Sequence, residues 1–120
     1  AVVPLVPPKV SVVQLPAAGS AAAIAQAALD PSTKVVGAFH NVGSQKLHAG
    51  AKADCDVLVF SDDAEARAAV IELADAVSNR GVDGGALANS AAAEAMTSVL
   101  ISINRKYKVK GAGIAISGLA

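Results

Sequence analysis

One short stretch restricts the fold of this chain more than any other, the apolar run "CDVLVFS" at residues 55–61. A run of this kind is typical of a strand buried on both faces of a parallel sheet. Residues 62–79 follow at once with helical periodicity, and residues 81–85 read as a short strand that ends in a glycine turn. Because parallel strands need a crossover, this order predicts a βαβ unit.

The helix predicted at 62–79 carries its own start signal and its own buried face. Asp62 can cap it, and Glu65, three residues further on, would complete a capping box. An apolar stripe recurs at helical spacing, at Val70, Leu73 and Val77.

The remaining segments continue the alternation of strands and helices. A helix is expected at 20–29, with Ser20 as its N-cap, and the longest helix is expected at 89–108. Its inward stripe would be Met96, Val99, Leu100, Ile103 and Tyr107. Residues 44–50 form a turn of helix at best, and three further strands are expected, at 1–6, 33–42 and 112–118. The predicted fold is therefore α/β, a Rossmann-like three-layer arrangement with a mostly parallel sheet, in one domain over residues 1–120.

Composition excludes several classes of partner. Ten acidic side chains balance ten basic ones, so nothing favours nucleic acid or an anionic membrane surface. No apolar run approaches the roughly 18 residues of a membrane span. A single cysteine, Cys55, excludes an internal disulfide and favours a reducing, cytoplasmic compartment, and we read it as a small buried hydrophobe.

Two observations suggest that the chain is part of something longer. It has no initiator Met and opens on apolar residues, so we expect a fragment, or a domain cut from a longer chain. It also lacks the glycine-rich loop with which nucleotide-binding parallel sheets usually open. The "GAG" at 111–113 has no third glycine and follows a helix, so it is no dinucleotide fingerprint.

Ligands of parallel α/β sheets bind beyond the carboxyl ends of the strands. This rule selects four segments, at 35–44, 61–63, 83–90 and the "VPP" at 6–8. The first is the most specific, because an apolar strand would end there in two polar residues, His40 and Asn41. Their hydrogen-bond donors and acceptors could hold a flat, carbonyl-rich ring. The plainer interpretation is a histidine that only satisfies a loop carbonyl.

A second candidate lies where the longest helix begins. Asn89 and Ser90 would offer free helix-end amides, and Thr97 follows two turns later on nearly the same face. Plain capping explains the same residues. Capping also explains the acidic residues at 61–65, and His48 reads as a surface side chain. We assign no catalytic acid or base and no metal ligand.

Four stretches resemble one known family. They are "GAFHNVGSQKL", "DCDVLVFSDDAEARAAVIELA", "VDGGALANSAAAEAMTSVLISINRKYK" and "GAGIAISG". In order and spacing they resemble the C-terminal half of the NADP-dependent reductases of coenzyme F420, a deazaflavin. The resemblance implies hydride transfer between NADPH and coenzyme F420, with the protein aligning the two cofactors.

The resemblance also implies roles for individual residues. His40 would hydrogen-bond the deazaflavin edge, Val42 would pack on its ring, and Thr97 would contact its polar groups. Gly43 and Ser44 would border the nicotinamide. The cofactor-binding set is His40, Asn41, Val42, Gly43, Ser44, Asn89, Ser90, Thr97, Gly111 and Gly113.

Departures from the family leave alternatives open. Some relatives have Arg and Ser where this chain has Ala91 and Ala95, so the deazaflavin could be held differently. A similar module serves membrane metalloreductases that use flavin. A non-catalytic binding or dimerisation module is a further alternative. Because 1–6 would be an unpaired apolar edge strand, we also expect a homodimer. Without the nucleotide loop, we expect the isolated chain to be inactive.

Overall fold

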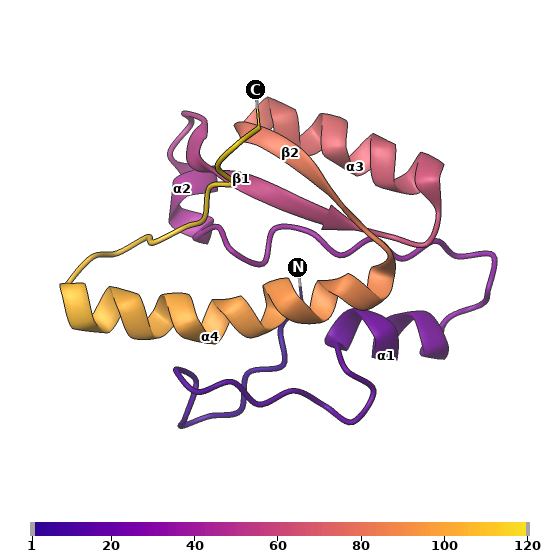
Figure 1. The fold of residues 1–120 in the computed structure, drawn as a ribbon, viewed down its shortest axis with the longest axis horizontal. Helices are drawn as coiled ribbons and strands as arrows, with labels where there is room; N and C mark the ends of the chain where they lie inside the picture. Colours follow the sequence, from indigo (N-terminus) through magenta and orange to yellow (C-terminus); the bar gives the residue numbers. More distant parts are fainter. Residues whose placement is uncertain (1, 120) are drawn as a thin grey trace.

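The computed structural model describes residues 2–119. Two strands and five helical segments follow one another along the chain, with longer irregular stretches at both ends (Figure 1). In order they are α1 (Ala21–Ala28), α2 (Ser44–His48), β1 (Ala53–Phe60), α3 (Ala64–Val77), β2 (Ser78–Gly85), the 3-10 turn η1 (Leu87–Asn89) and α4 (Ser90–Tyr107).

The predicted βαβ unit is confirmed. β1 and β2 pair in parallel, with Ala53 opposite Ser78 and Val57 opposite Gly81, and α3 makes the crossover. Figure 1 shows α3 on one side of this sheet and α4 on the other. Six of the eight residues of β1 are buried, as expected for a strand covered on both faces. The chain is thus α/β, around a sheet of two strands within residues 2–119.

The core of this unit is small. Ala38, Val57, Val59 and Ala74 are buried against one another, and Val36, Phe39, Val70 and Ile71 pack around them. The predicted inward position of Leu73 is wrong, because its side chain is 56% exposed. Ile71 and Ala74 take the sheet-facing place instead, and no side chain fits at Gly81, where a Cβ would lie 2.8 Å from the Ile71 carbonyl oxygen.

The start of α3 also differs from the prediction. Asp63, and not Asp62, is the N-cap, since its carboxylate accepts a hydrogen bond of 2.9 Å from the Ala66 amide. Asp62 reaches across to η1 and accepts from the Leu87 amide at 3.0 Å. The capping box with Glu65 is therefore wrong, although an aspartate does start the helix. The Ser20 cap of α1 is confirmed, at 3.0 Å from the Ala23 amide.

Three predicted strands are not strands in the structure, as far as residues 2–119 show. Residues 2–6 are irregular and Val2 is 63% exposed. The segment predicted at 33–42 pairs with β1 only through Gly37 and Phe60, and it runs antiparallel to β1. Phe39 has a left-handed backbone, with φ of 64°, and this conformation interrupts any regular ladder.

The third missing strand fails for a different reason. The Ile114 carbonyl accepts from the Asp56 amide at 2.8 Å, as a neighbouring strand would. Two residues later the Ile116 amide donates to the Asp56 carboxylate instead, at 2.7 Å. Arg80 binds the same carboxylate through two nitrogens, each at 3.1 Å. A side chain thus replaces the backbone ladder after one hydrogen bond.

Helix α4 buries a face that the apolar pattern predicted correctly only at Leu100. Its buried residues are Ser90, Ala93, Glu94, Ser98 and Leu100. Of the expected stripe, Met96, Val99 and Tyr107 are exposed. Small and polar side chains let the helix lie close to α1 and to residues 37–41, which explains why hydropathy missed this face. No helix within residues 2–119 is long and apolar enough to cross a bilayer.

Candidate functional site

The antiparallel course of residues 35–43 moves the first candidate site away from its predicted place. Gly37 lies beside Phe60, at the carboxyl end of β1. The Asn41 carbonyl, in contrast, lies near Gly113, which itself packs on Cys55 near the start of β1. The backbone at Asn41 therefore lies away from the carboxyl edge of the sheet, and that part of the prediction is wrong, whereas the His40 ring stays beside Phe60.

Helix α4 fixes the backbone at these two residues. The Asn41 side-chain amide donates to the Ala93 carbonyl at 2.9 Å, and the Thr97 hydroxyl donates to the His40 carbonyl at 2.7 Å. His40 and Asn41 are each only 7% exposed. Sequence had placed all of these except Ala93 in one site, and the structure brings them into direct contact.

The imidazole of His40 has an unsatisfied polar atom. Its Nδ1 is buried and has no hydrogen-bond partner within residues 2–119. Burial lowers the pKa of His40 below the ordinary value of 6.5, and the charge of Glu94 acts in the opposite direction. The ring is therefore neutral at pH 7, with one nitrogen able to donate and the other able to accept. A buried, unpartnered nitrogen of this kind calls for an explanation.

An open pocket of about 140 Å3 lies between the loop 40–43, α4 and the segment after α4. Six of the ten predicted cofactor-binding residues line it: His40, Asn41, Val42, Gly43, Thr97 and Gly111. At Gly111 a Cβ would lie 2.7 Å from Cε of Lys46, so glycine permits this close approach. The lining combines apolar side chains with amide, hydroxyl and ammonium groups, a usual mixture for a small-molecule site.

Sequence reasoning missed half of this lining. Leu100, Ile101, Asn104, Lys110 and Ala112 complete the pocket. A signal was present, because Thr97, Ile101 and Asn104 recur at spacings of four and three residues and so share one face of a helix. Asn104 also accepts from the Ala112 amide at 2.9 Å, which holds the segment after α4 against the pocket.

The other predicted residues lie outside this pocket. Asn89 donates to the Gly84 carbonyl at 2.9 Å, and the Ser90 hydroxyl donates to Glu94 at 2.6 Å. Ser44 is exposed at the start of the five-residue helix α2. Gly113 packs against β1, where a Cβ would lie 2.9 Å from Cβ of Cys55.

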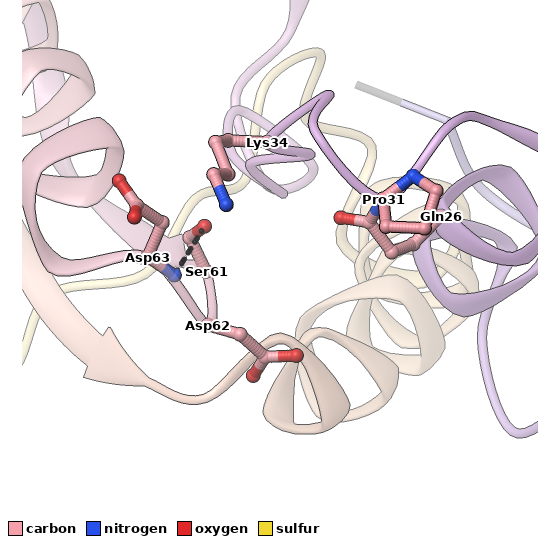
Figure 2. A pocket seen from close by; sticks show the side chains of 6 residues that line it. All are labelled: Gln26, Pro31, Lys34, Ser61, Asp62 and Asp63. Carbon is pink, nitrogen blue, oxygen red and sulfur yellow. Dashed lines mark hydrogen bonds between the residues drawn. The ribbon is translucent and has the colours of Figure 1, made fainter.

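A larger cavity, of about 330 Å3, lies at the carboxyl end of β1. Figure 2 shows Gln26 and Pro31 across its opening from the acidic turn that follows the strand. Its lining residues are Gln26, Pro31, Lys34, Ser61, Asp62 and Asp63. Both aspartates are engaged with backbone amides, as the capping interpretation of this turn predicted in general terms.

The fold and the first pocket define a class, an α/β protein with a polar and apolar small-molecule site beside its longest helix. No family model matches the chain. Individual relatives do match, and all three carry the name F420-dependent NADP reductase.

The chain is 44% identical over 106 residues to the reductase of Methanocaldococcus jannaschii, which covers 87% of this chain and 47% of that protein. It is 38% identical over 92 residues to the reductases of Methanothermobacter marburgensis and Methanothermobacter thermautotrophicus, which covers 75% of this chain. The chain thus spans less than half the length of these relatives. The resemblance to the F420-dependent NADP reductases is confirmed over most of this sequence.

Proposed function

We propose that this chain forms the deazaflavin side of an oxidoreductase that transfers a hydride between NADPH and coenzyme F420. The relatives' names support the two cofactors and the reaction class. The observation that supports this location is the pocket beside α4, which His40 lines together with five other residues that the resemblance had singled out.

The residues present fit part of a deazaflavin. Val42, Leu100 and Ile101 offer an apolar surface for a flat ring, while His40 and Asn104 offer hydrogen-bonding groups at its edge. Lys110 adds a cation for an anionic substituent. At about 140 Å3 the pocket is smaller than the roughly 300–1,000 Å3 of complete ligand sites, so it can enclose only one end of the ring.

The bound cofactors supply the redox chemistry, since a reduced nicotinamide gives up a hydride and an oxidised deazaflavin accepts it. This chain's contribution is orientation and exclusion of water. Thr97 and the Ala93 carbonyl hold the loop at residues 40–41 in place. Hydride transfer between the two rings requires no acid or base from the protein, and we assign none.

NADP is held by other residues in this proposal. The 120 residues contain no Gly-x-Gly-x-x-Gly loop, and relatives extend well beyond the matched region. We therefore place the NADP phosphates on a part of the parent enzyme outside this sequence, and we expect no turnover from the 120 residues alone.

A fluorescence titration of this chain with coenzyme F420 tests the proposal. The variant Val42→Glu puts a charge into the apolar wall and is expected to weaken binding at least tenfold. Val13→Glu, at an exposed position outside the pocket, is the matched control and should bind as the original does. Equal affinity for ordinary flavin mononucleotide would instead favour the flavin-dependent metalloreductase alternative, and no binding of either would favour a non-catalytic module.

A homodimer in the cytoplasm is part of the same proposal. An apolar edge strand at 1–6 does not support the dimer, because residues 2–6 form no strand. Support now comes from the exposed Met96 and Val99 on α4, and the free, buried Cys55 suits a reducing compartment. Sedimentation equilibrium would contradict the dimer if the mass stayed at 11.8 kDa at high concentration.

A further inference from the structure

The most deeply buried charged side chain of the described residues has no basic partner. Glu94, on α4, is 1% exposed. Its carboxylate accepts from the Ala21 amide at 2.6 Å, from the Ala22 amide at 3.4 Å and from the Ser90 hydroxyl at 2.6 Å. The two amides belong to the first turn of α1, where the helix dipole favours a negative charge. Glu94 therefore fastens the start of α1 to α4.

The same cluster extends to His40 through Gly37. A Cβ built on Gly37 would lie 2.6 Å from the Ser90 hydroxyl oxygen and 3.3 Å from Cε1 of His40. The hydroxyl that binds Glu94 and the imidazole of His40 thus meet at a position where only glycine leaves enough room. A shift of Ser90 would be transmitted to the imidazole, because protein interiors are close-packed.

Nothing else in the described residues fixes the imidazole by a hydrogen bond. The contacts from Thr97 and to Ala93 hold the His40 carbonyl and the Asn41 side chain, not the imidazole ring. The ring itself meets Phe60 at a centroid distance of 6.5 Å and an angle of 43°, and its Nδ1 is unpartnered. Packing and nearby charge therefore decide where the imidazole lies and whether it is protonated.

We propose that Glu94 is a positioning residue of the deazaflavin pocket, acting on the imidazole of His40 through Ser90 and through its own charge. This role rests on the proposed function, because it gives the position of His40 its purpose. No similarity or motif assigned a role to Glu94.

The charges around His40 are few. The charge of Glu94 acts on it from α4. Asp56, from β1, lines a narrow gap together with His40, but is already paired with Arg80. From α1 only the alanines Ala21, Ala22 and Ala25 share a cavity with His40. Glu94 is thus the anion near His40 that has no basic partner. Its replacement by a neutral side chain should change the pKa of the His40 imidazole.

The test is a proton NMR titration of this chain and its Glu94→Gln variant. The chain has two histidines, so the exposed His48 serves as an internal reference. Loss of the anion disfavours the imidazolium, and the titration midpoint of His40 is expected to fall in the variant. An unchanged His40 midpoint would overturn the proposal.

A second variant covers the case in which Glu94→Gln does not fold. Ser90→Ala keeps the charge but removes the hydroxyl that lies between Glu94 and the imidazole. The His40 resonance is then expected to move while that of His48 stays, and an unmoved His40 resonance would overturn the proposal.

Addition of coenzyme F420 to the same samples separates this inference from the function. If His40 responds to Glu94→Gln but not to the deazaflavin, Glu94 positions the ring and the proposed function fails. If the deazaflavin shifts the His40 resonance and Glu94→Gln does not, the proposed function is supported and the proposed role of Glu94 is contradicted.

Discussion

At the scale of single residues, Asp56 shows how one carboxylate can organise three segments. It is 2% exposed, and it binds the Ile116 amide and the Arg80 guanidinium. Arg80 in turn donates to the Ile116 carbonyl at 2.7 Å, so the last residues of the chain are held against the sheet. Asp56 lies within a sequence run typical of an ordinary buried strand, and no sequence pattern predicted its role.

We expect Asp56→Asn to lower the free energy of unfolding by about 2–3 kcal/mol at pH 7, because Arg80 loses its partner while it is still partly buried. Asp54→Asn is the matched control on the same strand. Its carboxylate is 82% exposed and paired with Lys46, so the loss of stability there should be much smaller than for Asp56→Asn. Urea denaturation measures both.

The difference in free energy of unfolding between the original chain and Asp56→Asn should depend on pH through the pKa of Asp56. The Ile116 amide is the main cause that holds this pKa below its ordinary value of 3.8, against the effect of burial. The stabilisation is thus complete above the unfolded pKa of about 3.9 and is lost as pH falls through the lower folded value. The gap between the original chain and Asp56→Asn should narrow below pH 4, and a constant gap would contradict this explanation.

At the scale of elements, hydrophobic periodicity predicted β1, α1, α3 and α4 because each is long or clearly capped. It failed where a local event overrides the pattern. Phe39 adopts a left-handed backbone, and the Asp56 side chain intercepts the Ile116 amide. The hydropathy pattern of the sequence predicts neither of these two features. The site was partly predictable, since the resemblance selected residues 40–43, but the face of α4 that completes the pocket follows only from its packing.

The start of α3 gives a test at this scale. Asp63→Ala removes the N-cap hydrogen bond to Ala66 and should cost about 1 kcal/mol of stability. Glu65→Ala should stay within about 0.5 kcal/mol, because Glu65 makes no capping contact. A larger loss for Glu65→Ala than for Asp63→Ala, measured by thermal unfolding, would restore the capping box that the structure argues against.

At the scale of the whole molecule, two cavities compete for the role of ligand site. The larger lies at the carboxyl end of β1, where the general rule for parallel sheets expects ligands. The smaller is lined by His40 and five other residues that the resemblance selected. We prefer the smaller because the aspartates of the larger are already bound to backbone amides, whereas the resemblance assigns the lining of the smaller to the deazaflavin.

The central claim is that the deazaflavin binds between the loop 40–43 and α4. An amide chemical-shift map of the isotope-labelled chain, recorded during a titration with coenzyme F420, tests it most directly. We predict that the largest shifts cluster at residues 40–43, 97–104 and 110–112. Shifts that cluster instead around Gln26, Lys34 and residues 61–63, or no shifts at millimolar coenzyme, would contradict the claim.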